Sequence, residues 1–152
     1  MLHVALWEPE IPPNTGNVAR LCAATGTRLH LIGRLGFRLD DRSLKRAGLD
    51  YWHAVDVVRH VTFEDFERDT AGLRVWCVET PSETPYTRAD YADGDCLLFG
   101  SESSGLPARV RERYAERLVG IPMPGGGAVR SLNLATAVGV VLYDALRRLH
   151  GW

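Results

Sequence analysis

Short apolar runs alternate along the chain with segments of helical periodicity. Apolar runs of about four to eight residues bounded by turn residues are typical of buried strands. They predict strands at 2–7, 28–33, 54–58, 74–80, 96–99 and 118–121. The segments between and after them predict helices at 15–25, 43–49, 62–69, 107–116 and 132–149. This alternation predicts an α/β fold with a mostly parallel sheet and helices on both faces.

Several helix ends carry a recognisable signal. Asn14 and Ser131 stand where the N-caps of the first and last helices are expected, because their side chains can accept a bond from a free helix N–H. Thr62 precedes a helical segment, with Asp65 three residues later. Gly26 is a natural stop for the first helix, because glycine readily adopts the left-handed conformation.

The length and composition predict one globular domain. The chain has 152 residues, of which 45% are hydrophobic, and no apolar run is long enough to cross a membrane. The N-terminus lacks the basic and apolar regions of a signal peptide. We therefore expect a single domain over 1–152, no membrane association and no appended RNA-binding domain.

Cysteines and histidines give no metal signal. Cys22, Cys77 and Cys96 form no CxxC pair and lie in apolar surroundings, so we expect buried thiols and a reducing, cytoplasmic location. The histidines are scattered without a spaced pair, which predicts structural or surface roles. They are His3, His30, His53, His60 and His150.

Basic residues fall into two groups although the net charge is only −1. The first contains few acids and is the better candidate for RNA contact; it comprises Arg34, Arg38, Arg42, Lys45 and Arg46. The second is interleaved with glutamates and predicts a solvated helix face; it comprises Arg109, Arg111, Arg113 and Arg117.

Three polar loops follow predicted strands, where ligands of open α/β sheets bind. Asn14 and Arg20 offer an amide and a guanidinium near a helix N-terminus, which suits an anionic partner, or they are a cap and a surface charge. Gly100 allows close approach of a ligand to the backbone. Glu102 could accept a proton, hold a ligand or cap a helix. Ser131 could place a hydroxyl beside the ligand.

Common cofactor and nucleophile fingerprints are missing. The sequence has no GxGxxG after its first strand, no GxxxxGK[ST], no HExxH and no GxSxG. This disfavours a dinucleotide-binding Rossmann domain, a P-loop enzyme, a zinc protease of that type and an α/β-hydrolase.

The three loops together resemble the SpoU (TrmH) branch of the SPOUT superfamily of RNA ribose methyltransferases. The family pattern N-x-G-x-x-x-R is matched by Asn14, Gly16 and Arg20, and G-x-E-x-x-G by Gly100, Glu102 and Gly105. The third pattern, I-P-M followed by S-L-N, is matched at 121–123 and 131–133. The segments 8–17, 36–37 and 46–51 are similar to the TrmL (YibK) family, and the similarity covers essentially the full chain. The glycine-rich stretch 124–128 departs from it, being longer than is usual there.

The resemblance implies an α/β knot fold whose C-terminal part forms a deep trefoil knot. It implies that the motif loops bind S-adenosylmethionine without a metal ion. It also implies a homodimer, formed through the first and last helices, with a site shared between subunits. The cofactor residues carried over are Val78, Thr80, Gly100, Glu102, Gly105, Ile121, Met123, Ser131 and Leu132.

The resemblance further implies 2′-O-methylation of the wobble nucleotide of tRNA, a cytidine or uridine, in the anticodon stem-loop. Arg20, from either subunit, would act as the base, although arginine normally stays protonated. Alternatively, it would grip a phosphate and orient the ribose hydroxyl. Partners that fix Arg20 and the ribose would be Asn14, Glu102, Ser131 and Asn133; RNA contacts would come from Arg20, Arg42, Lys45 and Arg46. Other tRNA or rRNA positions, and a non-catalytic RNA-binding knot protein, are the alternatives.

Overall fold

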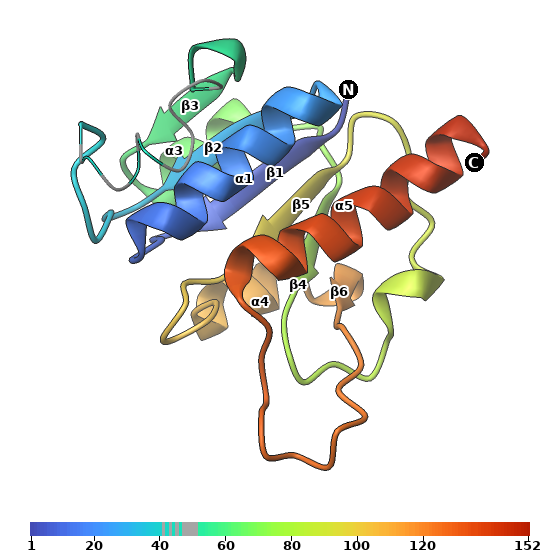
Figure 1. Cartoon of the computed structure of the whole chain (residues 1–152). Coiled ribbons are helices and arrows are strands. Elements are labelled where there is room, and N and C mark those ends of the chain that lie inside the picture. Colours follow the sequence, from blue (N-terminus) through green and yellow to red (C-terminus); the bar gives the residue numbers. More distant parts are fainter. Residues whose placement is uncertain (41, 43, 45, 47–51) are drawn as a thin grey trace.

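The protein is built on one parallel six-stranded sheet (Figure 1). The computed structural model describes residues 1–40, 42, 44, 46 and 52–152. The strand order is β3-β2-β1-β5-β4-β6, and each neighbouring pair is parallel. This confirms the predicted α/β class. The strands are β1 (His3–Trp7), β2 (Arg28–Ile32), β3 (Val57–His60), β4 (Val75–Val78), β5 (Cys96–Phe99) and β6 (Leu118–Val119).

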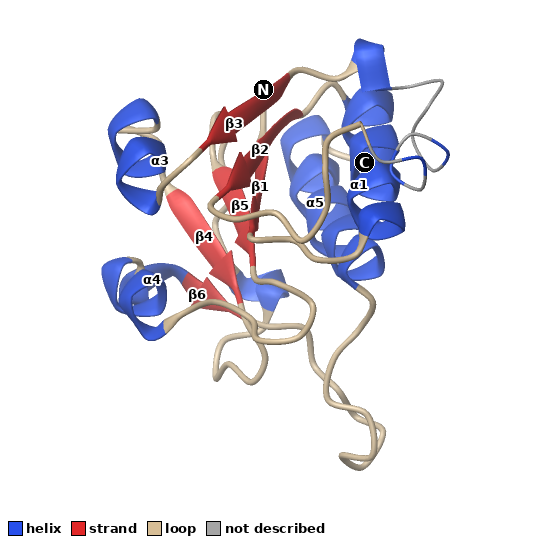
Figure 2. Cartoon of the chain, turned by 90° about the vertical axis from the view of Figure 1, so that its left-hand side faces the viewer, coloured by secondary structure: helices blue, strands red, loops and turns tan. Residues whose placement is uncertain are grey.

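Helices cover both faces of the sheet (Figure 2). On one face lie α1 (Pro12–Thr25) and α5 (Leu134–His150), and on the other lie α3 (Phe63–Asp69) and α4 (Ala108–Arg113). The predicted helix at 43–49 falls mostly outside the described residues. Short 3-10 helices complete the elements, at Trp52–Ala54, Tyr86–Arg88 and Ala115–Arg117.

Alternate residues of each strand enter two separate cores. Val4 and Leu6 pack in the larger core beneath α1 and α5, whereas Ala5 and Trp7 pack beneath α3 and α4. Both sides of a strand are therefore buried, as expected for a parallel sheet between helix layers. The three cysteines are buried free thiols, which confirms their predicted role.

Two predicted helix caps are wrong. Helix α1 begins at Pro12 with Ile11 as its N-cap, because the two prolines suit the first positions, where no N–H needs a partner. Asn14 therefore lies inside the first turn. Helix α5 is capped by Asn133, whose side chain accepts a bond from the N–H of Thr136 at 3.2 Å, and Ser131 lies before the cap.

Two other predicted helix ends are confirmed, and one predicted strand is displaced. Thr62 caps α3 by accepting from the N–H of Asp65 at 3.1 Å, and Gly26 ends α1 with φ of 65°. Both predictions are confirmed. The strand predicted at 54–58 is displaced: β3 starts at Val57, since that residue pairs with Leu29 of β2.

A row of three histidines crosses the sheet beneath α3. Nδ1 of His3 lies 2.9 Å from Nε2 of His30, and Nδ1 of His30 lies 2.9 Å from Nε2 of His60. Nδ1 of His60 lies 3.3 Å from a carboxylate oxygen of Asp69, although without hydrogen-bond geometry. The rings stack, and Phe66 packs edge-on against the last two. Three of the five histidines that look scattered in the sequence thus form one structural cluster, called the histidine row below.

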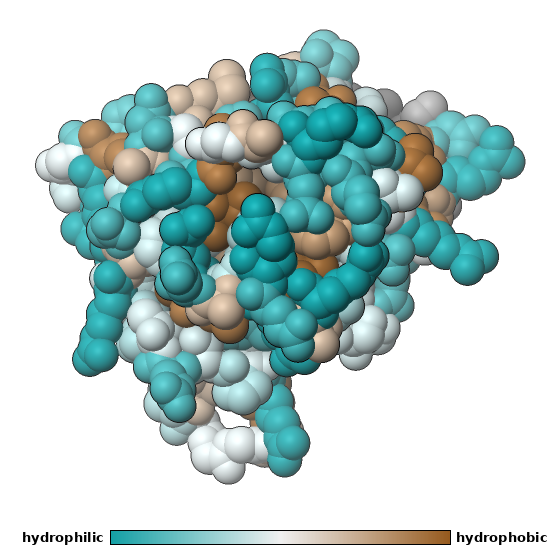
Figure 3. Space-filling view, turned by 180° about the vertical axis from the view of Figure 1, so that it is seen from behind, coloured by the Kyte–Doolittle hydropathy of each residue, from teal (hydrophilic) through white to brown (hydrophobic). Residues whose placement is uncertain are grey.

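The arginines of α4 form a solvated ionic surface with α3. Arg109 pairs with Glu64 and Arg113 with Glu67, each at 2.9 Å between exposed or half-exposed side chains. Hydrophilic residues cover much of this face (Figure 3). The prediction of a solvated helix face is confirmed for Arg109 and Arg113, whereas Arg117 is half-buried and donates to the carbonyl oxygen of Val75 at 3.3 Å. Among the described residues, no helix is both long and apolar enough to span a membrane.

Candidate functional site

A pocket of about 540 Å³ opens at the carboxyl ends of β4, β5 and β6. Its wall also includes Ile11 and Asn14, which follow β1, and the start of α5. The sheet order reverses between β1 and β5, and ligands of open α/β sheets bind outside such a switch point. The volume is typical of a small-molecule site.

All residues predicted to hold the cofactor line this pocket. They come from four segments that are far apart in the sequence and meet only in the fold. The residues are Val78, Thr80, Gly100, Glu102, Gly105, Ile121, Met123, Ser131 and Leu132.

The loop after β5 is a tight turn whose two glycines have different roles. Ser101 and Gly105 exchange backbone hydrogen bonds at 3.3 and 3.0 Å, so the chain folds back on itself. A Cβ on Gly100 would lie 2.3 Å from the carbonyl carbon of Gly105. Gly100 is therefore needed for an approach of the chain's own backbone. It also lines the pocket, and the approach of a ligand to its backbone stays a prediction. Gly105 has φ of 66°, a left-handed conformation that glycine adopts without strain in a tight turn.

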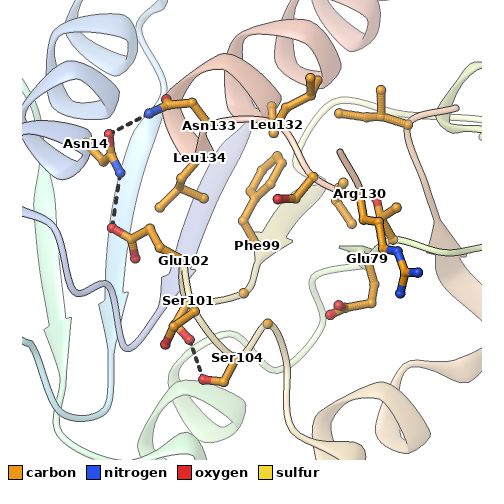
Figure 4. A pocket seen from close by; sticks show the side chains of 18 of the residues that line it. Asn14, Glu79, Phe99, Ser101, Glu102, Ser104, Arg130, Leu132, Asn133 and Leu134 are labelled. Carbon is orange, nitrogen blue, oxygen red and sulfur yellow. Dashed lines mark hydrogen bonds between the residues drawn. The ribbon is translucent and has the colours of Figure 1, made fainter. Parts of the chain in front are cut away.

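Glu102, Asn14 and Asn133, called the pocket triad below, tie three motif segments together (Figure 4). The carboxylate of Glu102 accepts from the N–H groups of Glu10 and Ile11 at 2.9 and 2.8 Å, and from Nδ2 of Asn14 at 3.3 Å. Nδ2 of Asn133 donates to Oδ1 of Asn14 at 2.9 Å. Because both carboxylate oxygens accept bonds from the protein, the geometry favours a holding role for Glu102 over that of a proton acceptor.

Four of the five predicted catalytic residues line the pocket, and Arg20 does not. Asn14, Glu102, Ser131 and Asn133 are among the lining residues, whereas Arg20 lies exposed on α1. Of the predicted RNA contacts, Arg42 and Arg46 are exposed, and Lys45 lies outside the described residues.

Sequence motifs missed several lining residues, of which Glu79 and Arg130 carry charge. Glu79 directly follows the fully buried strand β4, and Oε2 accepts a bond from the N–H of Leu106 at 2.9 Å. Burial raises the pKa of this carboxyl, while that bond and the charge of Arg111 act in the opposite direction. A charged residue at the end of a buried apolar run was the available signal. The other missed residues include Phe99, Ser101, Ser104 and Leu134.

Comparison with known proteins gives consistent matches over nearly the whole chain. The SpoU rRNA Methylase family matches residues 1–143. Proteins named tRNA (cytidine(34)-2′-O)-methyltransferase from Aeromonas hydrophila and Escherichia coli K12 are 49% and 46% identical over 150 residues. The matches cover 98% of this chain, and 95% and 94% of those proteins.

Solved structures agree with these matches. A structure reported under the words "Structural insights into the 2-OH methylation of C/U34 on tRNA" has a TM-score of 0.94 and 51% identity, covering 100% of this chain and 98% of that one. An AdoMet-bound rRNA methyltransferase from Sinorhizobium meliloti has a TM-score of 0.86 and 32% identity, covering 97% of this chain and 56% of that one. With the three motif segments meeting in one pocket, these matches show that the chain belongs to the SpoU methylase family of the SPOUT superfamily.

Proposed function

We propose that the protein transfers a methyl group from S-adenosylmethionine to the ribose 2′-hydroxyl of nucleotide 34 of tRNA. The observation that carries this proposal is the pocket, which gathers residues from each of the three family motifs at the carboxyl edge of the sheet. The names of the similar proteins support the tRNA substrate and the position. A cytoplasmic location and a single domain over 1–152 stay predictions.

The pocket residues fit this cofactor. Apolar side chains of Val78, Ile121 and Leu132 offer walls for an adenine ring, and the hydroxyl of Ser131 can meet ribose or amino-acid groups. Bound S-adenosylmethionine supplies a methyl group on a sulfonium, which is already a strong electrophile. The pocket triad would hold the loops in the shape that this ligand needs.

In this proposal, Arg20 acts in a site that two copies of the chain share. Because Arg20 is exposed on α1 and does not line the pocket of its own chain, a site shared with a second copy would bring it to the ribose. Helices α1 and α5 lie side by side and expose Asn17 and Tyr143, the latter 46% exposed, which makes this face the proposed dimer interface. Sedimentation at micromolar concentration tests this: a dimer is expected, and a monomer would contradict a shared site.

Two roles for Arg20 follow from its chemistry. It either takes the hydroxyl proton or, staying charged, binds the neighbouring phosphate and aligns the hydroxyl. Alignment of reacting groups alone can lower a barrier by about 7–11 kcal/mol.

The exposed side chains of Arg42 and Arg46, with Lys45, are the proposed contacts to the anticodon stem-loop. The backbone knot implied by family resemblance stays a prediction.

Methylation of unmodified tRNA transcripts, followed by mapping of the ribose-methylated nucleotide, tests the function. One methyl group at nucleotide 34 is expected, and a transcript with 2′-deoxyribose at that position should accept none. A product at another position would replace the proposed substrate with the alternative tRNA or rRNA target. Binding of tRNA without any product would indicate the non-catalytic alternative.

A matched pair of variants tests Arg20. Arg20→Ala should lower methyl transfer by about a hundredfold or more, a size common for a lost positioning or acid–base group. Arg109→Ala removes another exposed arginine, from the opposite face of the sheet, and should leave the rate close to wild type. Wild-type activity in Arg20→Ala would contradict the role of Arg20.

A further inference from the structure

Glu79 is a charged pocket residue that no motif of the chain includes. It directly follows β4, and its half-buried side chain lines the pocket. Oε2 is engaged by the N–H of Leu106 at 2.9 Å. Oε1 accepts no hydrogen bond from the described part of the chain, so it is available to a ligand.

The space for this carboxylate is built by a glycine of the second motif. A Cβ on Gly105 would lie 2.7 Å from Oε1 of Glu79, closer than real Cβ contacts allow. Any other residue at position 105 would displace the carboxylate, in addition to being strained at φ of 66°. Gly105 therefore leaves the space in which the Glu79 carboxylate lies against the loop after β5.

The electrostatic state of Glu79 points to a cationic ligand. Within 1–40, 42, 44, 46 and 52–152, the structure contains no ion pair of Glu79 with a basic side chain, although Arg130 also lines the pocket. Burial raises the pKa of the carboxyl and so opposes its charge. A positive charge brought into the pocket would offset this cost, because Coulomb attraction is stronger in a half-buried site than in bulk water.

We propose that Glu79 makes the pocket selective for the positively charged sulfonium cofactor over its uncharged thioether product. This rests on the proposed function. S-adenosylmethionine and S-adenosylhomocysteine share the adenosine, the ammonium and the carboxylate, and differ in the sulfonium methyl and its charge. A carboxylate that forms no ion pair with the described residues distinguishes the two ligands by that charge, and so favours release of product and entry of new cofactor.

Binding titrations of both ligands, without RNA, test this role separately from catalysis. Dissociation constants for S-adenosylmethionine and S-adenosylhomocysteine are measured calorimetrically for wild type and Glu79→Gln. The glutamine carbonyl can still accept from Leu106, so the loop contact is kept and only the charge is lost. We expect the variant to bind S-adenosylmethionine about tenfold more weakly and S-adenosylhomocysteine at most twofold more weakly. Glu83→Gln, an exposed position outside the pocket, is the matched control and should change neither constant.

A second measurement needs no variant. Sinefungin carries an amine in place of the sulfonium methyl, so the wild-type protein should bind it more tightly than S-adenosylhomocysteine. Equal weakening of both ligands in Glu79→Gln, or no change in their ratio, would overturn the proposal, and equal wild-type affinity for sinefungin and S-adenosylhomocysteine would overturn it independently. A wild-type protein that binds none of the three would refute the proposed function itself.

Discussion

The pocket triad and the histidine row are both chains of polar side chains, yet they occupy opposite environments. The triad joins three loops at the open edge of the sheet, around a pocket. The histidine row crosses adjacent strands in the closed core beneath α3, where His30 and His60 are 4% and 2% exposed. The triad combines a carboxylate with neutral amides. The row consists of three imidazole rings, and burial lowers the pKa of each and so favours its neutral form.

The difference shows that a row of hydrogen-bonded side chains can either shape a binding site or hold strands together. Where loops meet at an edge, bonded side chains set loop shape and leave room for a ligand. Where strands are fully covered, buried polar groups rely on partners within the protein, so the ring nitrogens of neighbouring strands bond to one another. Nδ1 of His60, which makes no hydrogen bond, lies beside Asp69 at the outer end of the row. Four predictions test this division, from the largest expected effect to the smallest.

Loss of the Glu102 carboxylate should damage the pocket most. Glu102→Ala removes acceptors for two backbone N–H groups and one amide, and bonds to a charged group contribute about 1.5–3 kcal/mol. We expect a loss of about 2 kcal/mol in the free energy of unfolding and at least tenfold weaker binding of S-adenosylhomocysteine. Urea unfolding and calorimetry measure the two effects. Unchanged ligand affinity would show that the triad does not shape the pocket.

The histidine row should make stability depend on acid. Burial lowers the pKa of His30 to about 3, and the pKa values of His3 and His60 are also lowered, mainly by burial. Above pH about 6.5 both folded and unfolded states are neutral at these rings, so their contribution is fully present. As pH falls below that value, the histidine rings bind protons in the unfolded chain but stay neutral in the folded protein. The free energy of unfolding therefore declines. At pH 5 the stability lost through His30 alone is about 2 kcal/mol.

Urea unfolding at pH 7 and pH 5 measures this decline. His30→Gln should reduce the difference between the two pH values, while His53→Gln, at an exposed position, should leave it unchanged. Equal stability of the wild-type protein at both pH values would contradict a neutral row.

Two helix caps separate stability from binding. Asn133→Ala and Thr62→Ala each remove a side-chain cap, worth about 1 kcal/mol in the free energy of unfolding. Asn133 also donates to Asn14, so only its variant should weaken ligand binding, by about threefold or more. If Thr62→Ala weakened binding equally, the effect would come from general destabilisation.

The outer end of the histidine row should matter least. The Asp69 carboxylate is 46% exposed and lies 3.3 Å from His60, so Asp69→Asn should cost under about 1 kcal/mol at pH 7. The pKa of His60 should fall further, because Asp69 raises it in the folded protein. Titration of the ring by NMR checks this, and a raised pKa would contradict the contact.

Local predictions succeeded where the deciding interaction lies within a few residues. Buried strands such as Cys96–Phe99 are recognisable from their apolar runs, and Thr62 and Gly26 act within one helical turn. The motif residues of the pocket were predictable through family resemblance. Asn14 and Ser131 were wrong as caps because neighbouring prolines and Asn133 take those positions.

The sequence by itself determined the parallel α/β architecture, the buried thiols and the three polar segments whose residues line the pocket. It could do so because strand periodicity, turn chemistry and motif spacing are properties of adjacent residues. Only the tertiary structure decided that His3, His30 and His60 join into one row, that Glu79 enters the pocket and that Arg20 stays outside the pocket of its own chain. Those outcomes depend on which strands become neighbours, and contacts between distant segments follow from packing of the whole sheet.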